Sequence, residues 1–334
     1  MNVNKTLLPQ SSGKLFLTDA GLETDLIFNH GVEIREFAAH TLLATAGGRS
    51  ALVRYFREYL LHARNSGTGF ILDSPTWKAH SHWADDLGST EDELREINKE
   101  AVSFIADLRD EFSSNPEPVV LNGLIGPRGD AYRPETAISA GEAEEYHAQQ
   151  VSWLAATEVN MLTAMTLTQS SEAIGIVKAA DKLCLPVVIS FTVETDGALP
   201  TGQPLSEAIA EVDAATDKAA AYFMINCAHP DHFTSVLQQG NWLRRIKGLR
   251  CNASRCSHAE LDAAEELDDG NPEELGQQYR ILIDKMPWVN VLGGCCGSDL
   301  RHLKAITAAV GTHSNIINTR EIANDQQIPR HHYA

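Results

Sequence analysis

Short β-type segments and stretches of helical character alternate eight times along this chain. The expected strands are Lys14–Thr18, Gly69–Leu72, Pro118–Leu124, Val159–Ala164, Leu185–Val193, Ala221–Asn226, Ile246–Arg250 and Val289–Leu292. The expected helices are Ser50–Asn65, Thr90–Phe112, Ser139–Thr157, Ser171–Lys182, Leu205–Ala219, a segment beginning at Pro230, Pro272–Lys285 and Ser298–Val310. Eight such units in one domain-sized stretch favour a closed parallel barrel, so we predict an α/β fold of the (β/α)8 TIM-barrel type.

An open, doubly wound sheet is the alternative that this alternation leaves. Such a sheet more often has a G-x-G-x-x-G turn after its first strand, and Asp19-Ala-Gly-Leu-Glu-Thr24 does not match that pattern. No Pro- or Ser-rich linker interrupts the 334 residues. We therefore expect one domain over residues 1–334, with a core from about 15 to 310 and a polar, peripheral tail at 311–334.

Local signals mark two of the helix starts. Thr90 and Glu93 have the spacing of a capping box, in which each side chain accepts a hydrogen bond from the other residue's backbone N–H. Ser298 or Asp299 is the expected N-cap of the last helix.

The charge of the chain limits its partners. Its 27 Lys and Arg residues against 45 Asp and Glu residues give a formal net charge of −18, which would repel a nucleic-acid backbone over most of the surface. No apolar run approaches the ~20 residues of a membrane span, and residues 1–14 lack the apolar core of a signal peptide. We expect a cytoplasmic protein that binds neither nucleic acid nor membrane. Its six cysteines are then reduced, which favours metal binding or buried thiols over disulfides.

Three of the cysteines that follow predicted strands form the first candidate site. Cys227 closes the sixth strand, and Cys295 and Cys296 lie in the Gly293-Gly-Cys-Cys-Gly297 turn after the eighth. Glycine allows the backbone to turn sharply enough for two adjacent side chains to face one space. Chemistry in a parallel barrel gathers where the strands end, so the three thiols are predicted to share the catalytic face. Three thiolates and an open fourth position suit a catalytic Zn²⁺, whereas a structural zinc is normally closed by a fourth protein ligand.

Other residues are alternatives for these roles. Cys251, at the end of the seventh strand, is the rival that would form a set with the two adjacent cysteines. His229 is an alternative ligand or a proton acceptor. Free cysteine is also often only a buried packing residue, and this is the interpretation of Cys184.

Several motifs resemble those of the homocysteine S-methyltransferase family. The resemblance runs from about residue 15 to 310, and the Gly-Gly-Cys-Cys-Gly turn is its most specific element. The other stretches that carry it are Asp19-Ala-Gly-Leu-Glu-Thr24, Thr76-Trp-Lys-Ala79, Asn122-Gly-Leu-Ile-Gly-Pro-Arg-Gly129, Pro186-Val-Val-Ile-Ser-Phe-Thr192, Thr201-Gly-Gln-Pro-Leu205 and Ile225-Asn-Cys227.

The resemblance implies a zinc-dependent barrel that transfers a methyl group to a thiol. By default the acceptor is L-homocysteine and the product methionine, and the donor is S-methylmethionine, S-adenosylmethionine or a methylated cofactor. Free thiols are mostly protonated at neutral pH, and coordination to Zn²⁺ deprotonates them while leaving a nucleophilic sulfur. By position, Cys227, Cys295 and Cys296 match the family's metal ligands, and Asn226 matches the Asn beside a ligand.

The resemblance also assigns residues after the first strand to the acceptor. Asp19 matches an acid that faces the acceptor, and Ala20 and Gly21 match backbone amides near its carboxylate. Without the motif, Asp19 is equally well explained as a turn cap. Glu23 and Asp25 are expected on a solvated turn and receive no role.

Two departures from the family bear on the acceptor. Met165 stands where relatives carry a Glu that binds the ammonium of homocysteine, and a neutral thioether cannot pair with an ammonium group. Trp77 stands where relatives carry a Tyr that approaches the metal. Either a neighbour such as Asp73 or Glu194 compensates, or the acceptor is another thiol or a selenol. Ordinary packing of both side chains and a non-catalytic, ligand-binding barrel are the remaining alternatives.

Overall fold

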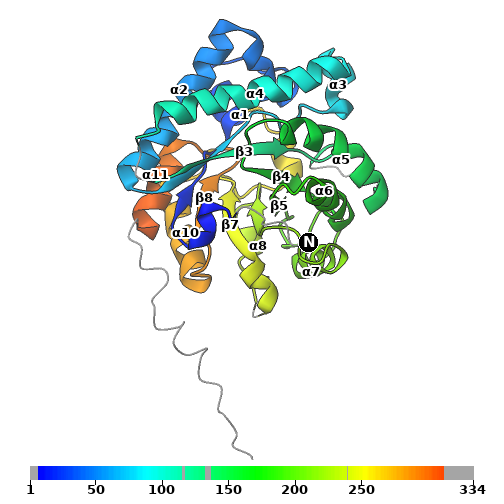
Figure 1. Cartoon of the computed structure of the whole chain (residues 1–334). Coiled ribbons are helices and arrows are strands. Elements are labelled where there is room, and N and C mark those ends of the chain that lie inside the picture. Colours follow the sequence, from blue (N-terminus) through cyan, green and yellow to red (C-terminus); the bar gives the residue numbers. More distant parts are fainter. Residues whose placement is uncertain (1–6, 115–116, 132–136, 239, 312–334) are drawn as a thin grey trace, which may run out of the picture.

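The fold is a closed parallel barrel, seen in a computed structural model that describes residues 7–114, 117–131, 137–238 and 240–311 (Figure 1). The strands pair in chain order, and β8 pairs with β1 to close the barrel. They are β1 (Phe16–Leu17), β2 (Gly69–Asp73), β3 (Val119–Ile125), β4 (Met161–Leu167), β5 (Val187–Phe191), β6 (Phe223–Asn226), β7 (Ile246–Cys251) and β8 (Val291–Gly294). The predicted (β/α)8 fold is confirmed, and the predicted tail lies almost wholly outside the described residues.

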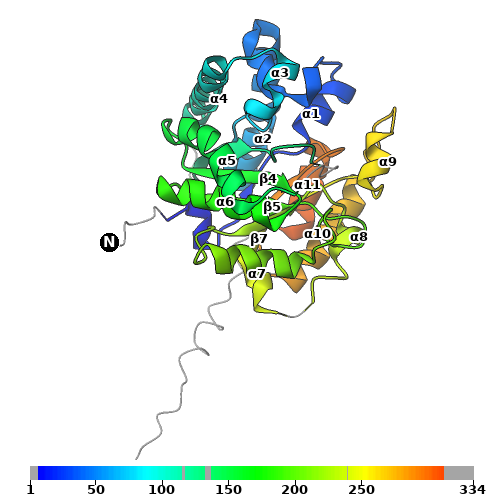
Figure 2. The ribbon, with the colours of Figure 1, turned by 90° about the vertical axis from the view of Figure 1, so that its right-hand side faces the viewer.

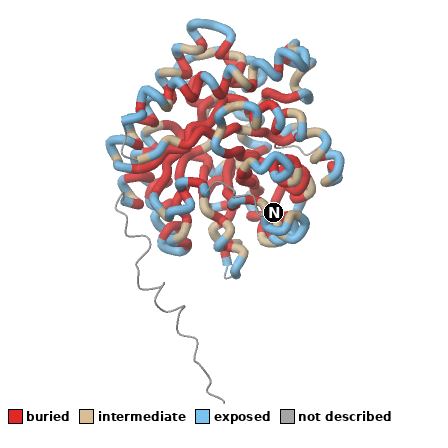
Figure 3. Tube along the Cα trace, viewed as in Figure 1, coloured by how far each residue is buried: buried red, intermediate tan, exposed pale blue. Residues whose placement is uncertain are grey.

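Helices surround the barrel and expose their outer faces, while the strands are buried (Figure 3). The long ones are α2 (Ala46–Ser66), α4 (Glu91–Glu111), α5 (Ala140–Ala155), α6 (Ser170–Lys182), α7 (Leu205–Ala215), α10 (Pro272–Lys285) and α11 (Leu300–Val310). The short ones are η1 (Pro9–Ser12), α1 (Leu22–Thr24), η2 (Asp25–Asn29), η3 (Arg35–Phe37), η4 (Ala39–Ala44), η5 (Ser81–Trp83), α3 (Ala84–Leu87), α8 (Pro230–Phe233), η6 (Asn241–Arg245) and α9 (His258–Asp262). No helix in these described ranges is long and apolar enough to cross a membrane.

The predicted helix caps are confirmed. Thr90 and Glu93 form the reciprocal capping box at the start of α4. Asp299, rather than Ser298, is the N-cap of α11 and accepts a hydrogen bond from the backbone N–H of Arg301. The interpretation of Cys184 as a buried packing residue was wrong. Cys184 is exposed, with φ of 55°, in the turn after α6.

The barrel interior is divided into an apolar layer and a polar layer. Side chains two residues apart on a strand point to the same face, so each inward apolar residue is followed by a second inward position closer to the strand's end. The apolar layer contains Phe16, Ile71, Val120, Met161, Val188, Met224 and Val291. The polar layer above it contains Asp73, Asn122, Thr163, Ser190, Asn226 and Arg250, all buried. The functional face is thus placed at the carboxyl ends of the strands.

Strand β8 begins and ends two residues later than expected, and its glycines are paired with β7 through Arg250↔Gly293 and Cys251↔Gly294. A Cβ atom on Gly293 would lie 1.9 Å from Thr18 Oγ1 and 2.7 Å from the carbonyl oxygen of Asp19. Only a residue without a side chain fits between β8 and β1 at this level.

Gly293→Ala is therefore expected to destabilise the protein by about 1–3 kcal/mol, the usual cost of overpacking. Gly141→Ala is the matched control, since that glycine lies in the exposed first turn of α5 and nothing is within 4 Å of its would-be Cβ. Urea unfolding of both variants and the parent measures the difference. Equal stability of the two variants would contradict the tight approach of β8 to β1.

Candidate active site

The three predicted cysteines meet at the carboxyl ends of β6 and β8. Their Sγ atoms all lie within 4.8 Å of one another, and those of Cys227 and Cys296 are 3.5 Å apart. Cys227 has φ of 56°, in the left-handed region, which turns the chain sharply as it leaves β6. Hydrogen bonds from the thiols of Cys227 and Cys296 hold the pKa of Cys295 well below its usual value.

This donor set suits a soft metal ion. Sulfur ligands about 2.3 Å from a tetrahedral zinc lie roughly 3.8 Å from one another, close to the spacing of these thiols. Among the described residues this is the one group of three potential ligands that comes together. Cys251 does not join it: the residue is fully buried, and its backbone N–H donates to the hydroxyl of Tyr279. His229 does not join it either, because its Nδ1 caps α8 by accepting from the N–H of Asp231.

Asn226 connects three strands next to the cysteines. Its Oδ1 accepts hydrogen bonds from Ser190 Oγ at 2.6 Å and from the backbone N–H of Thr166 at 3.0 Å. Its Nδ2 donates to Thr166 Oγ1 at 2.8 Å and lies 3.9 Å from Cys295 Sγ. Thr166 has φ of 66°, which is strained for a β-branched residue. The amide of Asn226 thus holds this strained bend of β4 beside a cysteine.

A buried ion cluster joins Arg250 of β7 to carboxylates at the ends of β1 and β2. The Arg250 guanidinium is paired with Asp19 through Nη2 at 2.5 Å and with Asp73 through Nη1. Its Nε also donates to the carbonyl of Gly294, while Asp73 accepts from Asn122 Nδ2 at 2.6 Å. Burial raises the pKa of Asp19 to about 7, and the charge of Asp73 adds to that rise against the opposing charge of Arg250.

Sequence reasoning missed Arg250, although the position of this residue in the active site could have been inferred from the sequence. The predicted seventh strand ended at this residue, and an inward position at the end of a barrel strand faces the active site. Asp73, named only as a possible compensating acid, belongs to the cluster, whereas Glu194 is paired with His258 at 3.1 Å.

The backbone amides assigned to the acceptor have partners within the chain. The N–H of Ala20 donates to the hydroxyl of Tyr55 at 3.3 Å, and that of Gly21 donates to the carbonyl of Ser298 at 3.1 Å. Their role toward an acceptor stays a prediction.

Trp77 and Met165, the two departures from the family pattern, contact each other. Trp77 Nε1 donates a hydrogen bond to the backbone carbonyl of Met165 at 3.1 Å. Both residues line the same cavity, and Met165 is only 6% exposed. The apolar wall that they form therefore replaces the charged group expected at this end of β4.

A cavity of about 500 Å³ opens above the cysteines. Helices α1, α8 and α9 lie on one side of the barrel in Figure 2, and residues of α1 and α9 line this cavity. Among its described lining are the acidic residues Asp19, Glu23, Asp73, Asp130, Asp262, Glu266 and Asp268, the cations Lys78 and Arg250, and the aromatic residues Phe28, Phe37, Phe56, Trp77 and Trp83. The wall is thus strongly acidic.

The expectation of a solvated turn at Glu23 and Asp25 was wrong. The segment folds back over the barrel as α1 and η2, which buries Asp25 and brings Glu23 into the cavity wall. Burial raises the pKa of Glu23 to about 7.

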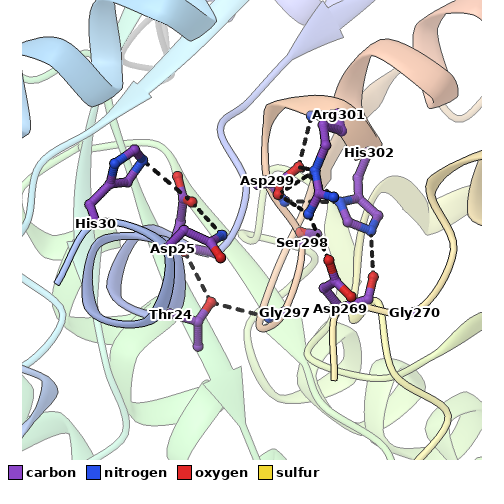
Figure 4. Close-up of polar contacts among 12 residues, drawn as sticks. Thr24, Asp25, His30, Asp269, Gly270, Gly297, Ser298, Asp299, Arg301 and His302 are labelled. Atoms are coloured by element: carbon purple, nitrogen blue, oxygen red, sulfur yellow. Dashed lines mark hydrogen bonds and ion pairs between the residues drawn. The ribbon is translucent and has the colours of Figure 1, made fainter. Parts of the chain in front are cut away.

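Further contacts hold the cysteine turn from outside (Figure 4). Thr24 Oγ1 accepts a hydrogen bond from the backbone N–H of Gly297 at 3.1 Å. On the other side, His302 links Asp299 to the backbone carbonyl of Asp269 through Nε2 at 2.8 Å. The turn is therefore fixed between α1 and the loop that precedes α10.

A sequence profile of the homocysteine S-methyltransferase family matches residues 16–310, which include all eight strands and all three cysteines. The chain belongs to this methyltransferase family. Homocysteine S-methyltransferase YbgG of Bacillus subtilis (strain 168) is 25% identical over 243 residues, which are 66% of this chain and 73% of the relative.

Solved structures of the homocysteine methyltransferase MmuM from Escherichia coli share the fold. The oxidised form gives a TM-score of 0.70 at 19% identity, and the metallated form gives 0.66 at 17% identity. Each comparison covers 90% of this chain and 99% of the E. coli chain.

A buried histidine makes the stability of the fold sensitive to acid. His40 is 2% exposed, neither of its ring nitrogens has a hydrogen-bond partner in the described structure, and burial lowers its pKa to about 4. A folded-state pKa below the unfolded value means that stability is full above about pH 6.5 and is lost as the pH falls toward 4.

From these two values, protonation of His40 is expected to remove about 2 kcal/mol of stability between pH 7 and pH 5. His40→Phe should remove that share of the acid sensitivity, and His82→Gln, at an exposed position, should not. Urea unfolding at pH 7 and pH 5 measures the stability lost by each protein. An unchanged pH dependence in the His40 variant would contradict the role of His40 in acid sensitivity.

Proposed function

We propose that this protein is a zinc-dependent thiol S-methyltransferase, with L-homocysteine as the default acceptor and methionine as the product. The observation that carries the proposal is the convergence of three thiols from two strand ends at the floor of one cavity. A reducing, cytoplasmic setting suits three free thiols.

Cys227, Cys295 and Cys296 would hold the zinc ion. When bound there, zinc lowers the pKa of an acceptor thiol, so that the sulfur is a nucleophilic thiolate at neutral pH. Asn226 keeps Cys295 in place through its contacts with β4 and β5.

The cavity wall suits a cationic methyl donor such as S-methylmethionine or S-adenosylmethionine. Acidic side chains attract a sulfonium, and aromatic faces such as those of Phe28 and Phe37 bind cations. In the transfer, the donor's sulfur–methyl bond breaks and its electron pair stays on that sulfur, while the acceptor sulfur forms a new bond to the methyl carbon. Both sulfurs end as neutral thioethers, so a cavity that excludes water favours the reaction.

A different thiol or a selenol is the second candidate acceptor. The observation in its favour is the apolar wall of Trp77 and Met165, which offers no charge to an ammonium group.

Calorimetric titration of zinc-loaded protein with L-homocysteine tests the proposal, with metal content established first by elemental analysis. We expect about one zinc per chain and homocysteine binding with proton release. Stoichiometric zinc without homocysteine binding would favour the second candidate. Absence of zinc binding would overturn the proposed chemistry.

A further inference from the structure

The loss of an acid from β4 raises the question of where an acceptor's ammonium group could bind. Met165 carries no charge, and its backbone carbonyl already accepts a hydrogen bond from Trp77 Nε1. Any ammonium site in this cavity must therefore come from another element. The answer depends on which of the acidic side chains that line the cavity lacks a cation of its own.

Two of the inner carboxylates are already paired. Asp19 and Asp73 share the Arg250 guanidinium, and each also accepts a hydrogen bond from a neutral donor, Tyr55 and Asn122 respectively. These carboxylates brace β1 and β2 against β7. They have little remaining capacity to bind a ligand.

Glu23 differs from both. It lies in α1, directly after the first strand's turn, and is partly buried in the cavity wall, where its charge acts on Asp19 and Cys295. Its carboxylate accepts a hydrogen bond from its own backbone N–H. No arginine, lysine or histidine lies within ion-pair distance of it in the part of the chain that the structure describes. Lys78, whose charge acts on Glu23, donates to the carbonyl of Glu36 and lies 3.7 Å from the Trp83 ring centroid.

We propose that Glu23 determines acceptor specificity by binding the ammonium group of an aminoalkyl thiol. The inference rests on the proposed function, because it needs an acceptor sulfur at the cysteine cluster. Glu23 reaches the cavity from the segment after β1, three strands away from β4, which carries Met165. The ammonium site is thereby moved to another element of the cavity wall rather than lost.

The acidic residues of the cavity rim do not serve equally well. Asp262, Glu266 and Asp268 are exposed at the end of α9 and on the segment after it, where water screens their charge. Glu23 lies in α1, and this helix contacts the cysteine turn through the hydrogen bond from the Gly297 N–H to Thr24 Oγ1. Glu266 is thus a matched control: it lines the same cavity with the same charge, but from the exposed rim.

The test compares three thiols on zinc-loaded protein by calorimetry. L-Homocysteine carries both charged groups, 3-aminopropane-1-thiol only the ammonium, and 4-mercaptobutanoate only the carboxylate. The parent protein is expected to bind the two ammonium-bearing thiols about 10- to 100-fold more tightly than 4-mercaptobutanoate, the range of a charged hydrogen bond. Glu23→Gln should remove this preference by weakening only those two thiols, and Glu266→Gln should preserve it.

Zinc content and thermal stability of each variant show whether the fold and the metal site are intact, and Glu23→Asp should keep part of the preference. Equal weakening of all three thiols by Glu23→Gln, or an unchanged preference, would overturn the inference while leaving the proposed function standing. Tight binding of 4-mercaptobutanoate to the parent protein would overturn it as well. Failure of every thiol to bind the zinc-loaded parent would instead reject the proposed function.

Discussion

Replacing Cys296 by serine is expected to abolish zinc retention and, with it, methyl transfer. A serine hydroxyl stays protonated at neutral pH and is a poor ligand for a soft site, so two thiolates would remain where three converge. The loss of metal affinity should exceed the roughly 10- to 100-fold that changes beyond the ligands cause. Elemental analysis after dialysis against a weak chelator measures retention, and calorimetry measures acceptor binding.

Two other cysteines provide the controls. Cys256→Ser changes a partly exposed thiol that does not belong to the cluster, and it should retain zinc. Cys251→Ala removes the rival ligand, which is buried at the end of β7. It should lower stability without lowering zinc content. Zinc retained by the Cys296 variant but lost by the Cys251 variant would reject our ligand assignment.

Arg250→Met is expected to cost about 3–5 kcal/mol of stability at neutral pH, the effect of leaving buried charges without their partner. Asp19 and Asp73 would both remain in the barrel with no cation between them. Loss of the guanidinium removes the charge that holds the pKa of Asp19 down, so this pKa must rise further above its unfolded value and the folded state would bind still more protons than the unfolded state. The variant should therefore regain stability as the pH falls from 7 toward 5.

Urea unfolding as a function of pH measures both effects. Arg250→Met combined with Asp73→Asn should recover part of the loss, because it removes one of the unpaired charges. Arg57→Met, which breaks an exposed pair with Glu111, should change stability little. A loss in the Arg250 variant that stays constant across this pH range would indicate a packing defect instead of unpaired charge.

The fold was predictable because its signals are local and repeated. Eight β-type segments with intervening helical periods leave few topologies, and capping residues such as Thr90 set helix ends without tertiary help. The positions of Cys227, Cys295 and Cys296 were predictable for a related reason. In a parallel barrel, a residue that ends a strand is on the active-site face wherever the strand lies in the sequence.

The partners of individual side chains were decided only by the tertiary structure. The sequence shows an arginine at position 250 but not that it meets the two carboxylates at the ends of β1 and β2, because strand tilt and barrel closure set that distance. Glu23 was predicted to be solvated, because a polar turn without hydrophobic periodicity does not indicate which elements it packs against. Cys184 was misjudged for the complementary reason, as burial depends on the surrounding elements and not on residue type alone. The sequence of this protein thus determined its barrel and the end of the barrel that holds the cysteines. The closure of that barrel determined which of its inner charges are paired, and the fold of α1 brought Glu23 into the cavity wall.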